Sequence, residues 1–235
     1  MSKVPKHRSK TGRSTRRRGT PPSFNQESAE KLWLARGAED VFFQREAQIT
    51  WWSVLGGIAV AALLTELDSV PQGIEAGRWD VGLYFLATCL VIVNSWVQTA
   101  WASLILKWPI SISTSLSLFF LGLSLSVAAL NITQPAIWYA AMSVVLLTGL
   151  FNQVVFTKNH AWVALAPELV VQTRASARIY VAMTLFAIAY TVYLAVGLSV
   201  AAEMGGGIIA FLVALFTLIR QHLEMVEEKH RMGIA

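Results

Sequence analysis

Charged residues are scarce in this chain of 235 residues. Only 14% are Asp, Glu, Lys or Arg, while 55% are hydrophobic. An ordinary soluble domain carries about 25% charged residues. The apolar residues also come in long uncharged blocks, which is typical of membrane helices rather than of a soluble core. The composition therefore predicts one integral membrane domain.

Cysteine is almost absent as well. Cys89 is the only one, and it lies inside an apolar block. A single thiol can neither form an intrachain disulfide nor supply a pair of metal ligands. We interpret Cys89 as a small core residue.

The motifs of common enzymes are missing too. The chain contains no Gly-x-Ser-x-Gly, no His-Glu-x-x-His, no phosphate-binding glycine loop and no Gly-x-Gly-x-x-Gly. His222 and His230 are eight residues apart with glutamates nearby. A solvated helix face accounts for that pattern better than a metal site does. We expect no catalytic residue, no metal site and no cofactor.

Six apolar segments are long enough, or nearly so, to cross a hydrocarbon layer of about 30 Å. They predict an all-α membrane domain of about six transmembrane helices over residues 50–220. Proline and an acid suit the first turn of a helix, so the fifth helix is predicted to begin near Pro167 and Glu168. Three glycines, Gly205 to Gly207, are interpreted as the turn into a short sixth span. The predicted spans are Thr50–Leu67, Val81–Leu106, Pro109–Leu130, Ala136–Phe156, Ile179–Val200 and Gly205–Ile219.

Serines alternate with other residues in the third span, which is a period typical of a strand. A lone strand cannot cross lipid, because its backbone groups would stay unpaired. We therefore predict a helix here, with serines able to bond to neighbouring helices. The serines are Ser111, Ser113, Ser115, Ser117, Ser124 and Ser126.

The two ends of the chain are polar. Residues 1–22 carry eight basic residues and no acid, so residues 1–26 are predicted to be a disordered cytoplasmic tail. We expect this tail, with Arg16, Arg17 and Arg18, to dock on anionic lipid headgroups rather than on nucleic acid. Residues 27–49 predict an amphipathic helix at the membrane interface. Residues 221–235 predict a cytoplasmic C-terminal extension.

Orientation follows from Lys and Arg, which are retained on the cytoplasmic side. If the chain crosses the membrane six times, Arg78 is the only Lys or Arg predicted on the side opposite the basic tail. An odd number of crossings would separate the basic C-terminal residues from the tail. The sequence thus predicts a cell-membrane protein with both termini in the cytoplasm.

The predicted spans contain no Asp, Glu, Lys, Arg or His once interface positions are set aside. Proton-coupled transporters and pumps usually need such groups at membrane depth. Their absence from the predicted spans argues against proton-driven transport. The polar residues that remain are neutral. They indicate either a polar lining for water or ions, or hydrogen bonds between helices. These residues are Asn94, Gln98, Thr99, Asn152 and Gln153.

Acidic residues gather in the outer loop between the first two spans. Glu66, Asp68, Glu75 and Asp80 stand there against Arg78. They could form a vestibule that concentrates cations. Alternatively, acids simply remain where topology removes basic residues.

Small residues recur every fourth position in two spans, which predicts close helix packing within or between protomers. The first set is Ser53, Gly57 and Ala61, and the second is Gly206, Ala210 and Ala214. Nine tryptophans are also present. Most, including Trp52 and Trp138, fall near span ends, as an interfacial aromatic belt requires.

Residues 45–51 read Arg-Glu-Ala-Gln-Ile-Thr-Trp. This stretch resembles the start of the first helix in the bacterial and lysosomal potassium-channel family, which reads Arg-x-x-x-Phe-Ser-Asp. Arg45 is kept, Ile49 and Thr50 are conservative replacements, and Trp51 takes the place of the aspartate. The order of the predicted segments over residues 45–220 is similar too.

The second span adds to this resemblance. Trp96 matches a tryptophan of the family, with Thr99 where a histidine follows three residues later. Gly56 falls where an apolar residue narrows the family's pore. The resemblance implies an oligomer, tetrameric in bacteria, of six-helix subunits with a cation pore around the first helix.

Three functions are compatible with these observations. The first is an oligomeric cation-channel-like pore built around the first helix. The second is a structural or accessory subunit of a larger membrane complex, which suits the uncharged spans, the tryptophans and the basic tail. The third is a small-solute transporter that uses neutral polar residues, although the broken helices typical of transporters are not evident.

Overall fold

The computed structural model describes residues 38–104, 112–158, 167–197 and 200–231. Every regular element in these ranges is a helix, which confirms the all-α prediction. The predictions for the basic tail and for residues 27–37 lie outside the described residues. The helices are α2 (Ala38–Thr65), α3 (Ser69–Glu75), α4 (Trp79–Leu104), α5 (Ile112–Ala129), α6 (Pro135–Lys158), α8 (Pro167–Ala195) and α9 (Val200–Arg231).

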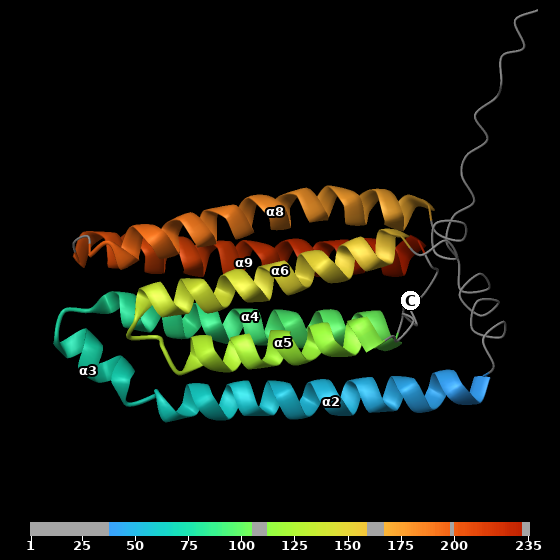
Figure 1. The fold of residues 1–235 in the computed structure, drawn as a ribbon, viewed down its shortest axis with the longest axis horizontal. Coiled ribbons are helices and arrows are strands. Elements are labelled where there is room, and N and C mark those ends of the chain that lie inside the picture. Colours follow the sequence, from blue (N-terminus) through green and yellow to red (C-terminus); the bar gives the residue numbers. More distant parts are fainter. Residues whose placement is uncertain (1–37, 105–111, 159–166, 198–199, 232–235) are drawn as a thin grey trace, which may run out of the picture.

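The long helices run alternately up and down beside one another (Figure 1). Ala38, where α2 begins, and Arg231, where α9 ends, lie at the same end of the bundle, which we call the terminal end. The short helix α3 lies at the opposite end, called the α3 end. The starts of α4, α6 and α9 are also at the α3 end.

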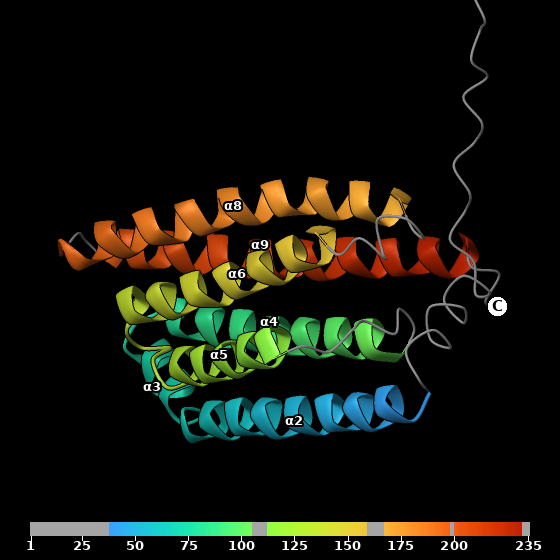
Figure 2. The same cartoon turned by 45° about the vertical axis from the view of Figure 1, so that its right-hand side comes forward.

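The bundle has two edges, formed by α2 and α8, with the other long helices between them (Figures 1 and 2). α2 packs against α4 and α5. α6 packs against α5 and α8, and α4 packs against α9. The first helix of the bundle is thus peripheral, and the interior is formed mainly by α4, α5, α6 and α9.

Five helical segments of the described chain are long and apolar enough to cross a membrane. α5 is also apolar, but its stretch Ser115–Ala129 is shorter than the others. The helices are therefore those of a multipass membrane protein, with five to six spans. The serine-rich segment is a helix, as predicted, because its buried hydroxyls find acceptors. Ser126 Oγ donates to the carbonyl of Gly122 over 2.9 Å, and Ser117 Oγ donates to Asn152 Oδ1 over 2.6 Å.

The start of α8 at Pro167 agrees with the prediction. The short sixth span is wrong. α9 runs unbroken from Val200 to Arg231 through the three glycines that were interpreted as a turn. The chain turns earlier, at Gly197, where φ is 82°. Glycine adopts this left-handed conformation without the steric penalty of a side chain.

Helices α2 and α9 also pass through the boundaries predicted for the membrane domain. α2 has no break between residues 49 and 50, and α9 has none between residues 220 and 221. Two tryptophans predicted for the interfacial belt are buried instead. Trp52 is 2% exposed and Trp138 is 3% exposed, because both face the core of the bundle.

The two sets of small residues have different environments. Gly206, Ala210 and Ala214 are buried where α9 meets its neighbours. Ser53, Gly57 and Ala61 are exposed on α2, and no atom lies within 4 Å of the place that a Cβ on Gly57 would occupy. The structure thus assigns the second set to packing within the protomer. The first set lies on the outer surface.

Gly206 and its neighbour provide a matched test of this packing. A Cβ on Gly206 would lie 2.6 Å from Tyr84 Oη and 2.7 Å from Tyr190 Cε1. Gly206→Ala should therefore lower the free energy of unfolding by about 1–3 kcal/mol. Gly205→Ala meets only Tyr190 Oη, at 3.8 Å, and should be neutral or raise it by up to about 1 kcal/mol. Thermal unfolding in detergent measures both, and equal melting temperatures would contradict the packing described here.

Candidate functional site

A cavity of about 630 Å³ lies inside the bundle. Residues of α4, α5, α6, α8 and α9 line it, and no described residue of α2 does. The volume is in the range of small-molecule sites, which are about 300–1,000 Å³. It reaches from Trp138 and Phe186, in the half of the bundle toward the α3 end, to Glu224 and Met225 near the terminal end, and it is partly open. The cavity therefore lies in the interior of the bundle, away from the first helix.

All five neutral polar residues singled out in the sequence line this cavity. Two of them lie on α6 and three on α4, and these helices bring them to one space. Gln221, Ser95 and Tyr180 join them from α9, α4 and α8. No local sequence pattern places Gln221 with the others, because the contact between α4 and α9 is a tertiary feature.

Some of these polar groups are satisfied within the bundle. Asn152 Oδ1 accepts a hydrogen bond from Ser117, and Gln98 Nε2 donates to Tyr180 Oη over 3.4 Å. Thr99 Oγ1 donates to the carbonyl of Ser95 over 2.9 Å. For Asn152 in particular, the interpretation as a hydrogen bond between helices is sufficient.

Other amides are not satisfied. Asn94 Oδ1, Gln153 Oε1 and Gln221 Oε1 are enclosed and accept no hydrogen bond from the described chain. An enclosed polar atom without a partner costs about 1–3 kcal/mol. Three such oxygens on three helices around one cavity therefore reduce stability, and helix packing alone does not explain them. Unsatisfied groups of this kind are common at functional sites.

An aromatic layer closes the cavity toward the α3 end. It comprises Tyr84, Trp138, Tyr139, Phe186 and Tyr190, and the ring centroids of Tyr139 lie 4.8 Å from those of Tyr190 and 5.1 Å from those of Trp138. Tyr84 and Trp138 are 5.0 Å apart. Trp138 Nε1 also donates to Thr88 Oγ1 over 2.8 Å. Contacts of this density leave little room for a solute.

Three tyrosine hydroxyls of this layer fix the start of α9. Tyr190 donates to the carbonyl of Ala202 over 2.6 Å, Tyr84 to that of Glu203 over 3.1 Å and Tyr139 to that of Gly206 over 2.7 Å. These tyrosines come from α8, α4 and α6. The first two turns of α9 are therefore bonded to three helices at once, which holds the aromatic layer in place.

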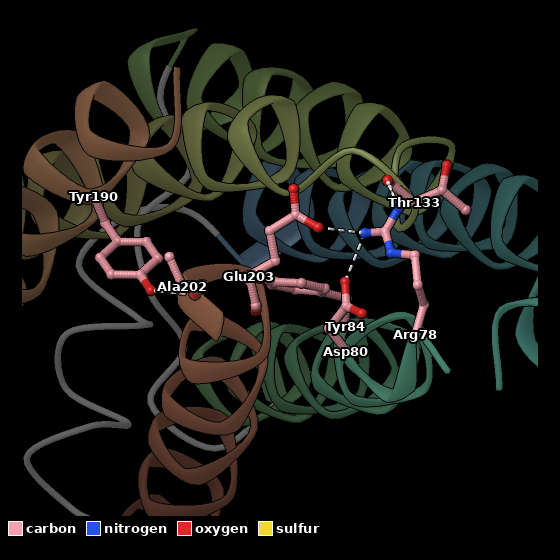
Figure 3. Close-up of polar contacts among 7 residues, drawn as sticks. All are labelled: Arg78, Asp80, Tyr84, Thr133, Tyr190, Ala202 and Glu203. Atoms are coloured by element: carbon pink, nitrogen blue, oxygen red, sulfur yellow. Dashed lines mark hydrogen bonds and ion pairs between the residues drawn. The ribbon is translucent and has the colours of Figure 1, made fainter. Parts of the chain in front are cut away.

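A charged clamp lies beyond the layer, at the α3 end (Figure 3). Arg78 Nη2 lies 2.7 Å from Asp80 Oδ2 and 2.9 Å from Glu203 Oε2, and Nη1 donates to the carbonyl of Thr133 over 3.3 Å. The hydrogen bond to Asp80 is the main reason that the pKa of the Arg78 guanidinium is raised above its ordinary value. One side chain thus joins the start of α4, the start of α9 and the turn between α5 and α6.

Local sequence explains why acids stand at this point. Asp80 lies in the first turn of α4 and Glu203 in the first turn of α9. A carboxylate is stabilised there by the partial positive charge of the helix N-terminus. Because both helices start at the α3 end, their acids face the guanidinium of Arg78. Glu203 was missed in the sequence, although its position at the start of a span resembles that of Asp80.

The acids proposed for an outer vestibule are not equivalent. Asp80 is only 1% exposed and is paired with Arg78, so it belongs to the clamp. Glu66 accepts a hydrogen bond from Ser69 Oγ over 2.9 Å, while Asp68 and Glu75 are exposed. The exposed acids flank α3, and their attraction of cations stays a prediction.

An ion pair lies at the other end of the cavity. Arg220 Nη2 lies 2.7 Å from Glu224 Oε1 and donates to Ser176 Oγ over 3.1 Å. Of this group, Ser176 and Glu224 line the cavity. Arg220 therefore connects α9 with Ser176 of α8. Its positive charge also compensates the carboxylate of Glu224.

No three His, Cys, Asp or Glu side chains in the described part of the chain are grouped so that they could hold a metal ion. Comparison with known proteins adds no further assignment. No protein-family model, curated protein or solved structure matches this chain.

The clamp gives a second matched test. Arg78→Gln leaves the buried carboxylate of Asp80 without its cationic partner, a change that typically costs about 3–5 kcal/mol. Glu203→Gln removes only a partly exposed pair and should cost no more than about 1 kcal/mol. Unfolding in detergent compares the two variants. The double variant Arg78→Gln with Asp80→Asn should recover part of the free energy of unfolding that Arg78→Gln loses. If it recovers none, Arg78 stabilises the fold through contacts other than Asp80.

Proposed function

We propose that this protein is a multipass membrane protein that takes a small molecule into the cavity between α4, α6, α8 and α9, within a single protomer. The observation that carries this proposal is the meeting of Asn94, Gln153 and Gln221 in that cavity with amide oxygens that have no partner. Buried groups prepared for hydrogen bonding but left without it are what a binding site provides.

The proposed pathway opens toward one side. The cavity's lining continues to Glu224 and Met225 near the terminal end, while the aromatic layer and the Arg78 clamp close the α3 end. A molecule would therefore enter from the side that holds the termini. Passage to the other side would require the start of α9 to separate from its three tyrosines.

The distribution of basic residues supports a cytoplasmic position for the terminal end. Lys158 ends α6, Arg174 and Arg178 lie near the start of α8, and Arg220 lies in the last part of α9. All of these positions are in the terminal half of the bundle, whereas Arg78 lies at the α3 end. Lys and Arg are retained on the cytoplasmic side of membranes. We therefore propose that the cavity opens to the cytoplasm.

Cysteine labelling tests the access to this cavity. In a Cys89→Ala background, Ser95→Cys places a nearly isosteric thiol on the cavity wall, and Val93→Cys places one on the exposed face of the same helix. A neutral, membrane-impermeant methanethiosulfonate, made water-soluble by a sugar group, should modify Ser95→Cys at least tenfold faster when added to the side of the termini. Val93→Cys should not react, because a thiol in hydrocarbon does not ionise.

The sidedness can be read from closed vesicles whose orientation is established by protease cleavage of the basic tail. Equal modification of Ser95→Cys from both sides would contradict a closed α3 end. No modification from either side would contradict the proposed entry of solutes.

One observation favours a second candidate, the oligomeric pore around the first helix. Ser53, Gly57 and Ala61 form an exposed row on α2, while Leu55 and Ala59 face the core. Rows of small residues let membrane helices approach closely. Because this row has no partner helix within the described part of the protomer, a second copy could pack against it.

Cross-linking distinguishes this candidate. In the Cys89→Ala background, Gly57→Cys should give disulfide-linked dimers in native membranes after mild oxidation if α2 faces α2 of a second copy. Val93→Cys, exposed on α4, is the control for random collision. Equal yields from the two variants would remove α2 as an interface.

A further inference from the structure

We infer that the molecule held in the cavity is neutral and combines a planar ring with N–H or O–H donor groups. This inference deepens the proposed function and rests on it. Three features of the cavity lining carry it: the unpartnered amide oxygens, the absence of uncompensated charge and the aromatic side chains.

The amide oxygens define the polar part of the ligand. Asn94 Oδ1, Gln153 Oε1 and Gln221 Oε1, which come from α4, α6 and α9, accept no hydrogen bond from any residue in the described ranges. They lie 15, 18 and 21 residues after the starts of their helices at Trp79, Pro135 and Val200. At 1.5 Å per residue this is roughly 22–32 Å from the α3 end, which places all three in the terminal half of the bundle. A molecule at that depth needs donors.

These amides can turn toward a ligand. The terminal torsion of Asn and Gln is broad, so each amide group can rotate about it. An amide that already accepts a hydrogen bond does not have this rotational freedom. Asn152 Oδ1 is held by Ser117 over 2.6 Å and cannot turn without losing that bond. The three free oxygens have no such constraint.

The charge of the lining excludes most ions. Among the described residues of the lining, only Glu224 carries a formal charge, and Arg220 lies 2.7 Å from its carboxylate. A charged ligand would lose its hydration without gaining a counter-ion, which is strongly unfavourable in an apolar interior. A neutral ligand has no such penalty.

The apolar part of the lining is aromatic. Trp138, Tyr139 and Phe186 form the closed end, and Trp101 and Tyr180 lie along the walls. Aromatic side chains bind flat rings by stacked or edge-to-face contacts. Counted along their helices at about 1.5 Å per residue, Trp101 and Tyr180 lie at the depth of the amides. Donor groups turned toward the amides and a ring against Trp101 or Tyr180 would therefore satisfy both parts of the lining.

Four probes that share one ring separate these features. Benzamide is neutral and has N–H donors; N,N-dimethylbenzamide has none; benzoate is an anion; and benzylammonium is a cation. Each is tested on the full-length protein for protection of Ser95→Cys against the methanethiosulfonate reagent. Benzamide should protect at a concentration at least tenfold lower than that needed with any of the other three.

Two glutamine variants locate the effect. Gln153→Met removes the unpartnered amide and keeps the side-chain length, whereas Gln72→Met makes the same change on the exposed surface of α3. In the Ser95→Cys background, Gln153→Met should weaken benzamide protection at least fivefold and leave the melting temperature unchanged or raised. Gln72→Met should change neither. Lost protection together with a lowered melting temperature would indicate a structural role for Gln153 and overturn its assignment.

The outcomes also separate this inference from the proposed function. If benzylammonium or benzoate protects as well as benzamide, the ligand is not restricted to neutral molecules. If N,N-dimethylbenzamide protects equally, donors are irrelevant. If Ser95→Cys is labelled but no probe protects it, the ligand class is wrong while the accessible cavity stands. If Ser95→Cys is not labelled at all, the proposed function itself fails.

Discussion

The backbone of α9 around Gly206 is the contact on which the closed end of this bundle depends. Hydroxyls of Tyr84, Tyr139 and Tyr190 donate to carbonyls within the first two turns of this helix. They can approach so closely because Gly206 has no side chain in their way. A helix interior with three successive glycines is intrinsically weak, at about 1 kcal/mol per glycine relative to alanine. Here tertiary hydrogen bonds and ring packing offset that weakness and hold α9 against three other helices.

The polar groups of the clamp and of the cavity lining differ in their hydrogen bonding, although Arg78 Nε in the clamp is also enclosed without a partner among the described residues. At the α3 end, the tyrosine hydroxyls and the carboxylates of Asp80 and Glu203 all have partners. Around the cavity, amides on α4, α6 and α9 have oxygens without any. The amides around the cavity lack hydrogen bonds that a bound molecule would supply. Such an arrangement is compatible with a functional site, since functional sites often reduce the stability of the fold.

The uncharged interior narrows the chemistry further. The charged residues of the described helices lie toward the helix ends. Glu224, the acid in the cavity lining, is neutralised by Arg220. The carboxylates of Asp80, Glu203 and Glu224 in the described spans are each paired with an arginine. Neutral amides and aromatic rings instead favour passive binding of a neutral molecule.

Much of the helical architecture followed from the sequence alone, because hydropathy and helix-start signals are local properties. The helices, the start of α8 at Pro167 and the neutral polar residues of α4 and α6 were predictable for that reason. The cavity was not, since it forms where five helices meet. Arg78 and Glu203 are 125 residues apart, and no local pattern connects them. Likewise, two equivalent rows of small residues have opposite positions, one buried on α9 and one exposed on α2, because only helix packing decides which face of a helix finds a partner.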